Sequence, residues 1–138
     1  MTVVAPPALQ RIPSGVIGLD AVLDGGFLQG GTYIVAGMPG TGKTILGNQI
    51  CFRHAAAGGR ALYATLLAES HARMLLHLGT LRFFDASRLP DQVSYVSGLG
   101  ALEGEGLPGL VTLLRLVRSQ GRLRQWRRDE DGAGAASG

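Results

Sequence analysis

The sequence of 138 residues has one cysteine, Cys51, and none of its apolar runs approaches the roughly 18 residues that a membrane-spanning helix needs. Residues 1–10 lack the basic start and the long apolar segment of a secretory signal peptide. These absences predict a cytoplasmic location and no membrane partner. Apart from Glu69 near His71, the three histidines, His54, His71 and His77, are not spaced with cysteines or acidic residues in the manner of metal ligands, which favours ordinary packing or surface roles.

Lysine is almost absent, since position 43 holds the only lysine beside twelve arginines. The formal net charge of +3 lies entirely in residues 111–138, because positive and negative charges balance over residues 1–110. A basic segment can bind nucleic acid through its phosphates, so nucleic acid is a conceivable partner. The acidic residues interspersed in this segment favour a solvated tail instead.

Length and composition predict one packed domain over residues 11–119, preceded by an extended lead-in over residues 1–10. Residues 120–138 run from arginine-rich to acidic and end in small residues, which predicts a disordered tail. Apolar spacing predicts strands at 32–36, 61–67 and 93–96, and helices at 14–23, 42–57, 70–81 and 107–119. Strands that alternate with helices are typical of an α/β fold with a parallel sheet flanked by helices.

One motif in this pattern carries chemistry. The residues between the first predicted strand and the next helix match the phosphate-binding P-loop pattern GxxxxGK[ST]. They are Gly37, Met38, Pro39, Gly40, Thr41, Gly42, Lys43 and Thr44.

Each part of this P-loop has a physical role in holding a triphosphate. The glycines let the backbone curl so that N–H groups point inward at the positive end of the helix dipole. The Lys43 ammonium would reach the β- and γ-phosphates, and the Thr44 hydroxyl would complete the coordination of Mg²⁺. The motif therefore predicts binding of ATP or a close relative, with Mg²⁺ as the accompanying metal.

The residues before the P-loop carry a resemblance to a known family. The motifs Arg11-Ile12-Pro13-Ser14-Gly15, Gly18-Leu19-Asp20, Leu23 and Gly25-Gly26, followed by the P-loop, resemble the RecA-like ATPases of the KaiC and RadA group. The resemblance continues through Leu62-Tyr63 and Glu69-Ser70 to about Ser119, roughly the first half of the family's ATPase domain.

This resemblance implies a doubly wound sheet, a homo-oligomeric ring and nucleotide bound between subunits. It also implies a catalytic carboxylate after the second strand, and Glu69 matches that position. The KaiC pattern has two glutamates before a serine, but Ala68 replaces the first of them here, so the match rests on Glu69 alone. An exposed carboxylate that starts the next helix, where the dipole favours it, is the alternative interpretation of Glu69.

The sequence departs from the family at the Walker B element, an apolar strand that ends in the aspartate of the Mg²⁺ shell. Where that strand should follow, residues 122–129 read RLRQWRRD. The apolar pair before Asp85, Phe83-Phe84, falls too early and is expected to end a helix. The fold class predicted is therefore a RecA-like P-loop domain that is truncated before the Walker B strand.

Three functional hypotheses follow. The first is ATP binding by a KaiC-like chain whose hydrolysis is weak or absent, and the second is a RadA-type ATPase module of DNA recombination or repair. The third is a non-catalytic remnant of a truncated or frameshifted gene, suggested by the arginine-, glycine- and alanine-rich tail. A strand ending in aspartate, encoded in another reading frame after codon 118, would support the third.

Overall fold

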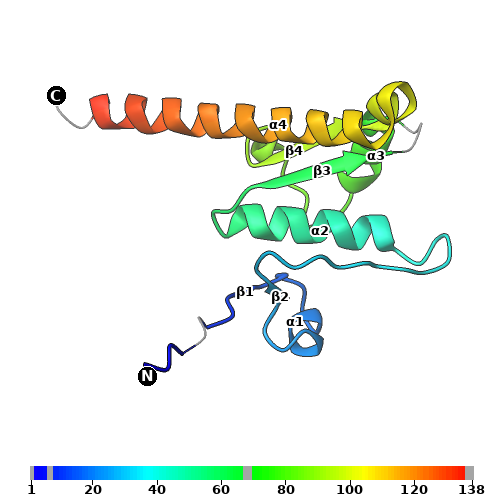
Figure 1. Ribbon diagram of the computed structural model, residues 1–138. Coiled ribbons are helices and arrows are strands. Elements are labelled where there is room, and N and C mark those ends of the chain that lie inside the picture. The colour runs from blue at the N-terminus through cyan, green and yellow to red at the C-terminus, as the bar shows by residue number, and fades with distance from the viewer. Residues whose placement is uncertain (1, 6–7, 67–69, 136–138) are drawn as a thin grey trace.

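The computed structural model describes residues 2–5, 8–66 and 70–135, with side chains as far as residue 120. Its centre is a sheet of two parallel strands, with helix α2 on one face and the long helix α4 on the other (Figure 1). The N-terminal elements lie beyond α2, on the side away from the sheet (Figure 1). The predicted α/β class, with a parallel sheet between helices, is confirmed.

The N-terminal unit is held together by the residues that carried the family resemblance. Strand β1 (Arg11–Ile12) pairs with strand β2 (Phe27–Leu28) in antiparallel fashion. The Arg11 guanidinium donates to the carbonyl oxygens of Leu23 and Gly26, at 2.7 and 3.1 Å. These contacts make Arg11 a structural clamp on the turn that precedes β2.

The helix between these strands, α1 (Leu19–Val22), is much shorter than the predicted 14–23. Gly15 and Gly18 have φ values of 70° and 85°, which lie outside the helical region and delay the first turn. Ser14 precedes this helix, and its N–H donates to Asp20 Oδ1 at 2.7 Å. Hydrogen bonds from Ser14 lower the pKa of the Asp20 carboxyl.

The strand predicted at residues 32–36 does not form, and this prediction was wrong. The segment has no regular secondary structure and no strand partner, and Ile34 is 91% exposed. Its β-rich composition indicates a strand, but a strand also needs a neighbour that completes its backbone hydrogen bonds. The two strands of the central sheet, β3 (Ala61–Thr65) and β4 (Val93–Ser97), pair with each other. Within the described residues no further strand remains to pair with this segment.

Helix α2 (Lys43–Ala56) and the strands β3 and β4 lie close to their predicted positions. The strands are in parallel register, with Ala61 opposite Val93 and Thr65 opposite Ser97. Gly58, with a φ of 91°, follows the end of α2 and turns the chain toward β3. The glycine pair therefore stops the helix, as the sequence predicts.

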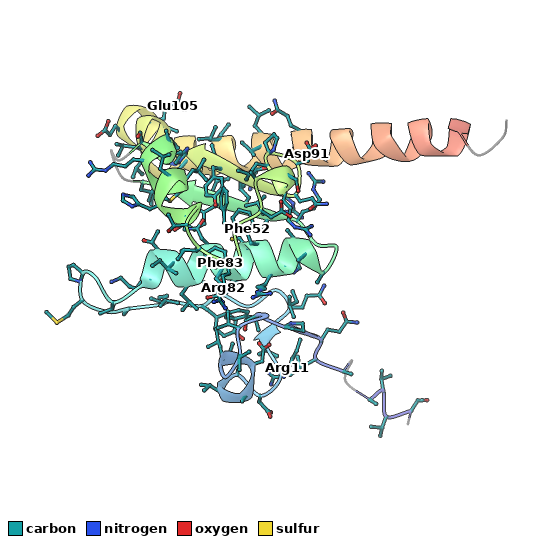
Figure 2. All side chains as sticks on the ribbon, turned by 180° about the vertical axis from the view of Figure 1, so that it is seen from behind. Arg11, Phe52, Arg82, Phe83, Asp91 and Glu105 are labelled. Atoms are coloured by element: carbon teal, nitrogen blue, oxygen red, sulfur yellow. The ribbon has the colours of Figure 1, made fainter. Side chains whose placement is uncertain are left out.

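Helix α3 (His71–Leu78) is capped by Ser70, whose hydroxyl accepts from the Arg73 N–H. After it, Phe83 and Phe84 pack on Phe52 of α2, with ring centroids 5.9 and 5.1 Å apart (Figure 2). Asp85 accepts a hydrogen bond from the Ser87 N–H and starts the 3₁₀ turn at Ala86–Arg88. The Phe83-Phe84-Asp85 segment is therefore a packed turn and no Walker B strand.

The hydrophobic core centres on Phe52, Ala55 and Val93, each at most 1% exposed. Cys51 packs against this cluster, and burial raises the pKa of its thiol. A raised pKa keeps the thiol protonated and poorly nucleophilic, as expected for a small core residue.

Helix α4 (Leu99–Ala135) contains the predicted helix 107–119 and extends beyond it at both ends. It is kinked at Gly106, with φ of 67° and ψ of −155°, so that Pro108 lies in the first turn after the kink, where proline is tolerated. The backbone of residues 120–135, for which the sequence predicts disorder, continues this helix. Arginine and alanine, frequent there, are good helix formers. Within the described residues, no helix is long and apolar enough to cross a membrane.

Candidate functional site

The P-loop lies between residues 32–36, which form no strand, and the first turn of α2. Of the predicted strand–loop–helix context, only the step from loop to helix is therefore present. Gly40 and Gly42 have φ values of 81° and 89°, a backbone conformation that strains any residue with a Cβ. Gly42 is the N-cap of α2, and this 14-residue helix directs the positive end of its dipole at the loop. The loop and the helix N-terminus together are suited to bind an anion.

The Lys43 side chain folds back over the P-loop. Its Nζ donates to the carbonyl oxygens of Gly37 and Met38, at 2.8 and 2.7 Å, and to Thr41 Oγ1 at 3.3 Å. Thr41 Oγ1 also donates to the Met38 carbonyl at 2.8 Å. The ammonium is thus already held at the loop, and a bound phosphate would take the place of these carbonyl contacts.

Thr44 follows Lys43 and lines a cavity of about 280 Å³ between α2, β3 and α3. The polar lining residues are Thr44, Thr65, His71 and His77. The apolar ones are Ile45, Tyr63, Met74 and Leu78. Thr44 is thus the part of the motif that faces the sheet. The sequence indicates no role for Thr65 and only a packing or surface role for His71. Both residues approach Thr44 because of the way β3 packs on α2, and the sequence alone does not reveal this packing.

A buried network of hydrogen bonds holds the backbone of Thr44. Asn48, one helical turn further along α2, is fully buried and donates through Nδ2 to the Thr44 carbonyl at 2.8 Å. Its Oδ1 accepts from the Tyr95 hydroxyl of β4. Burial raises the pKa of Tyr95, so the phenol stays protonated as a donor. The network joins the start of α2 to the sheet.

We expect Tyr95→Phe to lower the free energy of unfolding by about 1–3 kcal/mol, because it leaves the buried Asn48 oxygen without its donor. Urea denaturation monitored by circular dichroism measures this loss. Tyr33→Phe is the matched control, since the Tyr33 hydroxyl accepts from the Leu28 N–H at an exposed position. Equal losses in the two variants would contradict a stabilising role for the Asn48–Tyr95 contact.

Glu69, the predicted catalytic carboxylate, lies outside the described residues. Its role therefore stays a prediction. Within the described part of the chain, no three His, Cys, Asp or Glu side chains gather as a metal site. Thr44 stays the one residue for which the sequence predicts a contact with Mg²⁺. A single protein ligand is compatible with Mg²⁺, which keeps several waters and usually takes one or two protein ligands beside substrate phosphates.

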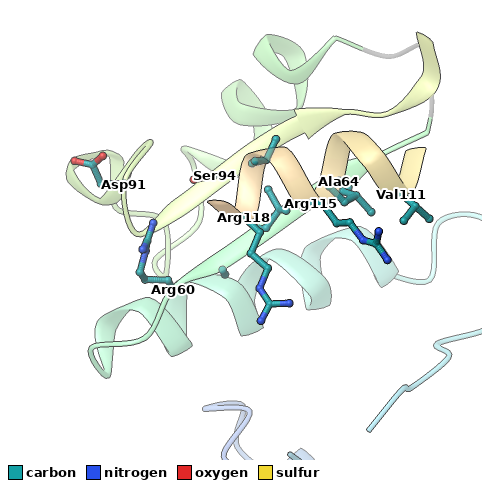
Figure 3. A pocket seen from close by; sticks show the side chains of 11 residues that line it. Arg60, Ala64, Asp91, Ser94, Val111, Arg115 and Arg118 are labelled. Atoms are coloured by element: carbon teal, nitrogen blue, oxygen red, sulfur yellow. The ribbon is translucent and has the colours of Figure 1, made fainter. Parts of the chain in front are cut away.

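A larger cavity, of about 570 Å³, lies between α4 and the sheet, away from the P-loop (Figure 3). Leu62 and Ala64 line it from the sheet, Val111 and Leu114 line it from α4, and arginines lie at its rim (Figure 3). Leu62 is 39% exposed, so α4 covers this face of the sheet incompletely. No P-loop residue lines this cavity.

Comparison with known proteins agrees with this geometry. The profile of the family described as "ATPase: KaiC" matches residues 12–79, which run from β1 through α3. The DNA repair protein RadA of Mycolicibacterium smegmatis is 41% identical over 63 residues, covering 46% of this chain and 14% of RadA. A UPF0273 protein of Methanopyrus kandleri is 36% identical over 64 residues, covering 46% of this chain and 25% of that protein. No solved structure matches significantly.

A GxxxxGK[ST] loop that opens a helix beside a parallel sheet is typical of P-loop α/β proteins. Within that class, residues 12–79 match the KaiC family and are similar to RadA, which supports a KaiC- and RadA-like fragment of the RecA superfamily. It spans about a quarter or less of the length of the curated relatives named above.

Proposed function

We propose that this chain binds ATP as its Mg²⁺ complex through residues 37–44. The observation that carries the proposal is the P-loop itself: two glycines of positive φ lead into the N-terminus of α2, and the Lys43 ammonium lies over the loop. Backbone N–H groups, the helix dipole and Lys43 would all attract the phosphates. The Thr44 hydroxyl would supply the protein ligand of Mg²⁺.

We further propose that hydrolysis is weak or absent. The family uses an aspartate at the end of the Walker B strand to order the Mg²⁺ shell, and residues 122–129 (RLRQWRRD) do not provide such a strand. In the described part of the chain, β4 is followed only by helix. Glu69 would remain as the single candidate carboxylate. Family resemblance also suggests a homo-oligomeric ring and a cytoplasmic location, both of which belong to this proposal.

A RadA-type role in DNA repair or recombination is the second candidate, favoured by the 41% identity to the mycobacterial RadA. Exposed arginines on α4, Arg115 and Arg118, could contact phosphates of a nucleic acid. This second candidate predicts that the chain binds single-stranded DNA and that the binding weakens with salt. Nucleotide binding alone does not predict any binding of DNA.

The test is a titration of the purified chain with Mg-ATP, followed by a phosphate-release assay at saturating ATP. We expect saturable binding that weakens when EDTA replaces Mg²⁺, without turnover above the buffer rate. A chain that fails to bind Mg-ATP at millimolar concentration would contradict the proposal. Hydrolysis of ATP at the rate of an intact ATPase would contradict the proposal that hydrolysis is weak or absent. Binding of labelled single-stranded DNA at low salt would favour the second candidate.

A further inference from the structure

We infer that His71 contacts the terminal phosphate of the bound nucleotide and so selects ATP over ADP. This inference rests on the proposed function. It assigns a binding role to a residue at the start of α3 that the P-loop motif does not include. Three observations carry it: the shared cavity with Thr44, the size of that cavity and the way the imidazole is held.

The first observation is position. Thr44 and His71 line the same cavity, although α2 and α3 are separate elements joined through β3. Thr65, the last residue of β3, lies between them in the chain and lines the cavity as well. In α/β proteins, ligands bind beyond the carboxyl ends of parallel strands, and this cavity includes the carboxyl end of β3. A phosphate held by the P-loop would extend toward it.

The second observation is size. A water molecule takes about 30 Å³ in the liquid, so a cavity of about 280 Å³ corresponds to about nine waters. That space can take a terminal phosphate with its metal and a few waters. The terminal phosphate is the part of the nucleotide that we place in this cavity, where it would meet His71.

The third observation is that the imidazole is held in place before any ligand binds. His71 Nε2 lies 2.7 Å from Thr65 Oγ1, and the ring centroid is 5.9 Å from that of Tyr95. Tyr95 in turn donates to Asn48, which holds the Thr44 carbonyl. His71 and Thr44 are thus connected through the same two side chains, those of Tyr95 and Asn48. In the tautomer in which Nε2 accepts from the Thr65 hydroxyl, Nδ1 carries the proton and is the ring nitrogen that can donate to a phosphate oxygen.

The two other histidines, His77 and His54, differ from His71 in exposure or in position. His77 also lines the cavity, but it lies at the end of α3 and its side chain is exposed. His54 is half-buried like His71 but lies near the opposite end of α2 from the P-loop, against Gly59. His54 is therefore the matched control, with similar burial and the same side chain.

The experiment measures the dissociation constants of Mg-ATP and Mg-ADP for the full chain and for three variants, His71→Ala, His71→Gln and His54→Ala. We expect His71→Ala to weaken ATP binding about 10- to 100-fold, the range for a hydrogen bond to a charged group, and to leave ADP binding unchanged. His71→Gln, which keeps an N–H donor, should restore part of the preference for ATP. His54→Ala should leave both constants unchanged.

Equal weakening of ATP and ADP by His71→Ala would show that the residue only supports the fold, and unchanged constants would show that it makes no contact. Either result overturns the inference while leaving the P-loop proposal intact, provided the unsubstituted chain binds. Failure of the unsubstituted chain to bind either nucleotide would overturn both. Thermal melting of each variant checks that it folds, and His71→Gln preserves the test if His71→Ala does not fold.

Discussion

Replacing Lys43 with alanine is expected to weaken Mg-ATP binding about 10- to 100-fold, since charge-assisted hydrogen bonds contribute roughly 1.5–3 kcal/mol each. The ammonium already lies at the loop, where Gly37 and Met38 carbonyls hold it. Phosphate oxygens would replace those carbonyls as its acceptors. Isothermal titration calorimetry of the two proteins with Mg-ATP measures the difference.

Arg82→Ala is the control for this substitution, because it removes one positive charge from an exposed position after α3. It should leave ATP affinity unchanged if the effect of Lys43 is local. The contacts of Lys43 are all with the exposed loop, so Lys43→Ala should change the free energy of unfolding by no more than about 0.5 kcal/mol. Equal ATP affinities of Lys43→Ala and the unsubstituted chain would rule out phosphate binding by the P-loop.

Phe52→Ala is expected to lower the free energy of unfolding by about 3–5 kcal/mol, which is a large part of the roughly 5–15 kcal/mol available to a small domain. Phe52 is 1% exposed and packs against Phe83 and Phe84. The substitution would leave a cavity where α2 meets the turn after α3. The shift of the urea midpoint, with an unchanged slope, measures the loss.

Leu76→Ala provides the comparison, since Leu76 lies on α3 but is 76% exposed. It should change stability by no more than about 0.5 kcal/mol. A similar loss in both variants would mean that Phe52 is not the centre of the core. Mg-ATP should raise the stability of the Phe52→Ala protein if its P-loop still binds, because a ligand that binds only the folded state stabilises it.

Much of the local structure could be predicted from the sequence. Helix α2 has apolar residues at helical spacing and a glycine pair after its end, and both signals lie within one short segment. The same holds for β3 and β4, whose predicted and observed bounds differ by two residues or fewer. The P-loop was identified because its glycines, its lysine and its threonine are adjacent in the chain.

The failures of prediction lie where a segment depends on distant partners or on backbone geometry. Residues 32–36 have the composition of a strand, yet no neighbour pairs with them in the described structure. The helix predicted at 14–23 shrank to Leu19–Val22 because Gly15 and Gly18 adopt positive φ. Composition alone does not indicate either outcome.

The sequence by itself determined the P-loop motif and the resemblance to the KaiC and RadA family, because both depend on residues close together in the chain. Only the tertiary structure decided that His71 and Thr65 share a cavity with Thr44, and that Asn48 and Tyr95 support it from within the core. These residues come from α2, β3, α3 and β4, up to 51 positions apart, as in the pair Thr44 and Tyr95. Parallel pairing of β3 with β4, and the packing of α2 against both, bring them together.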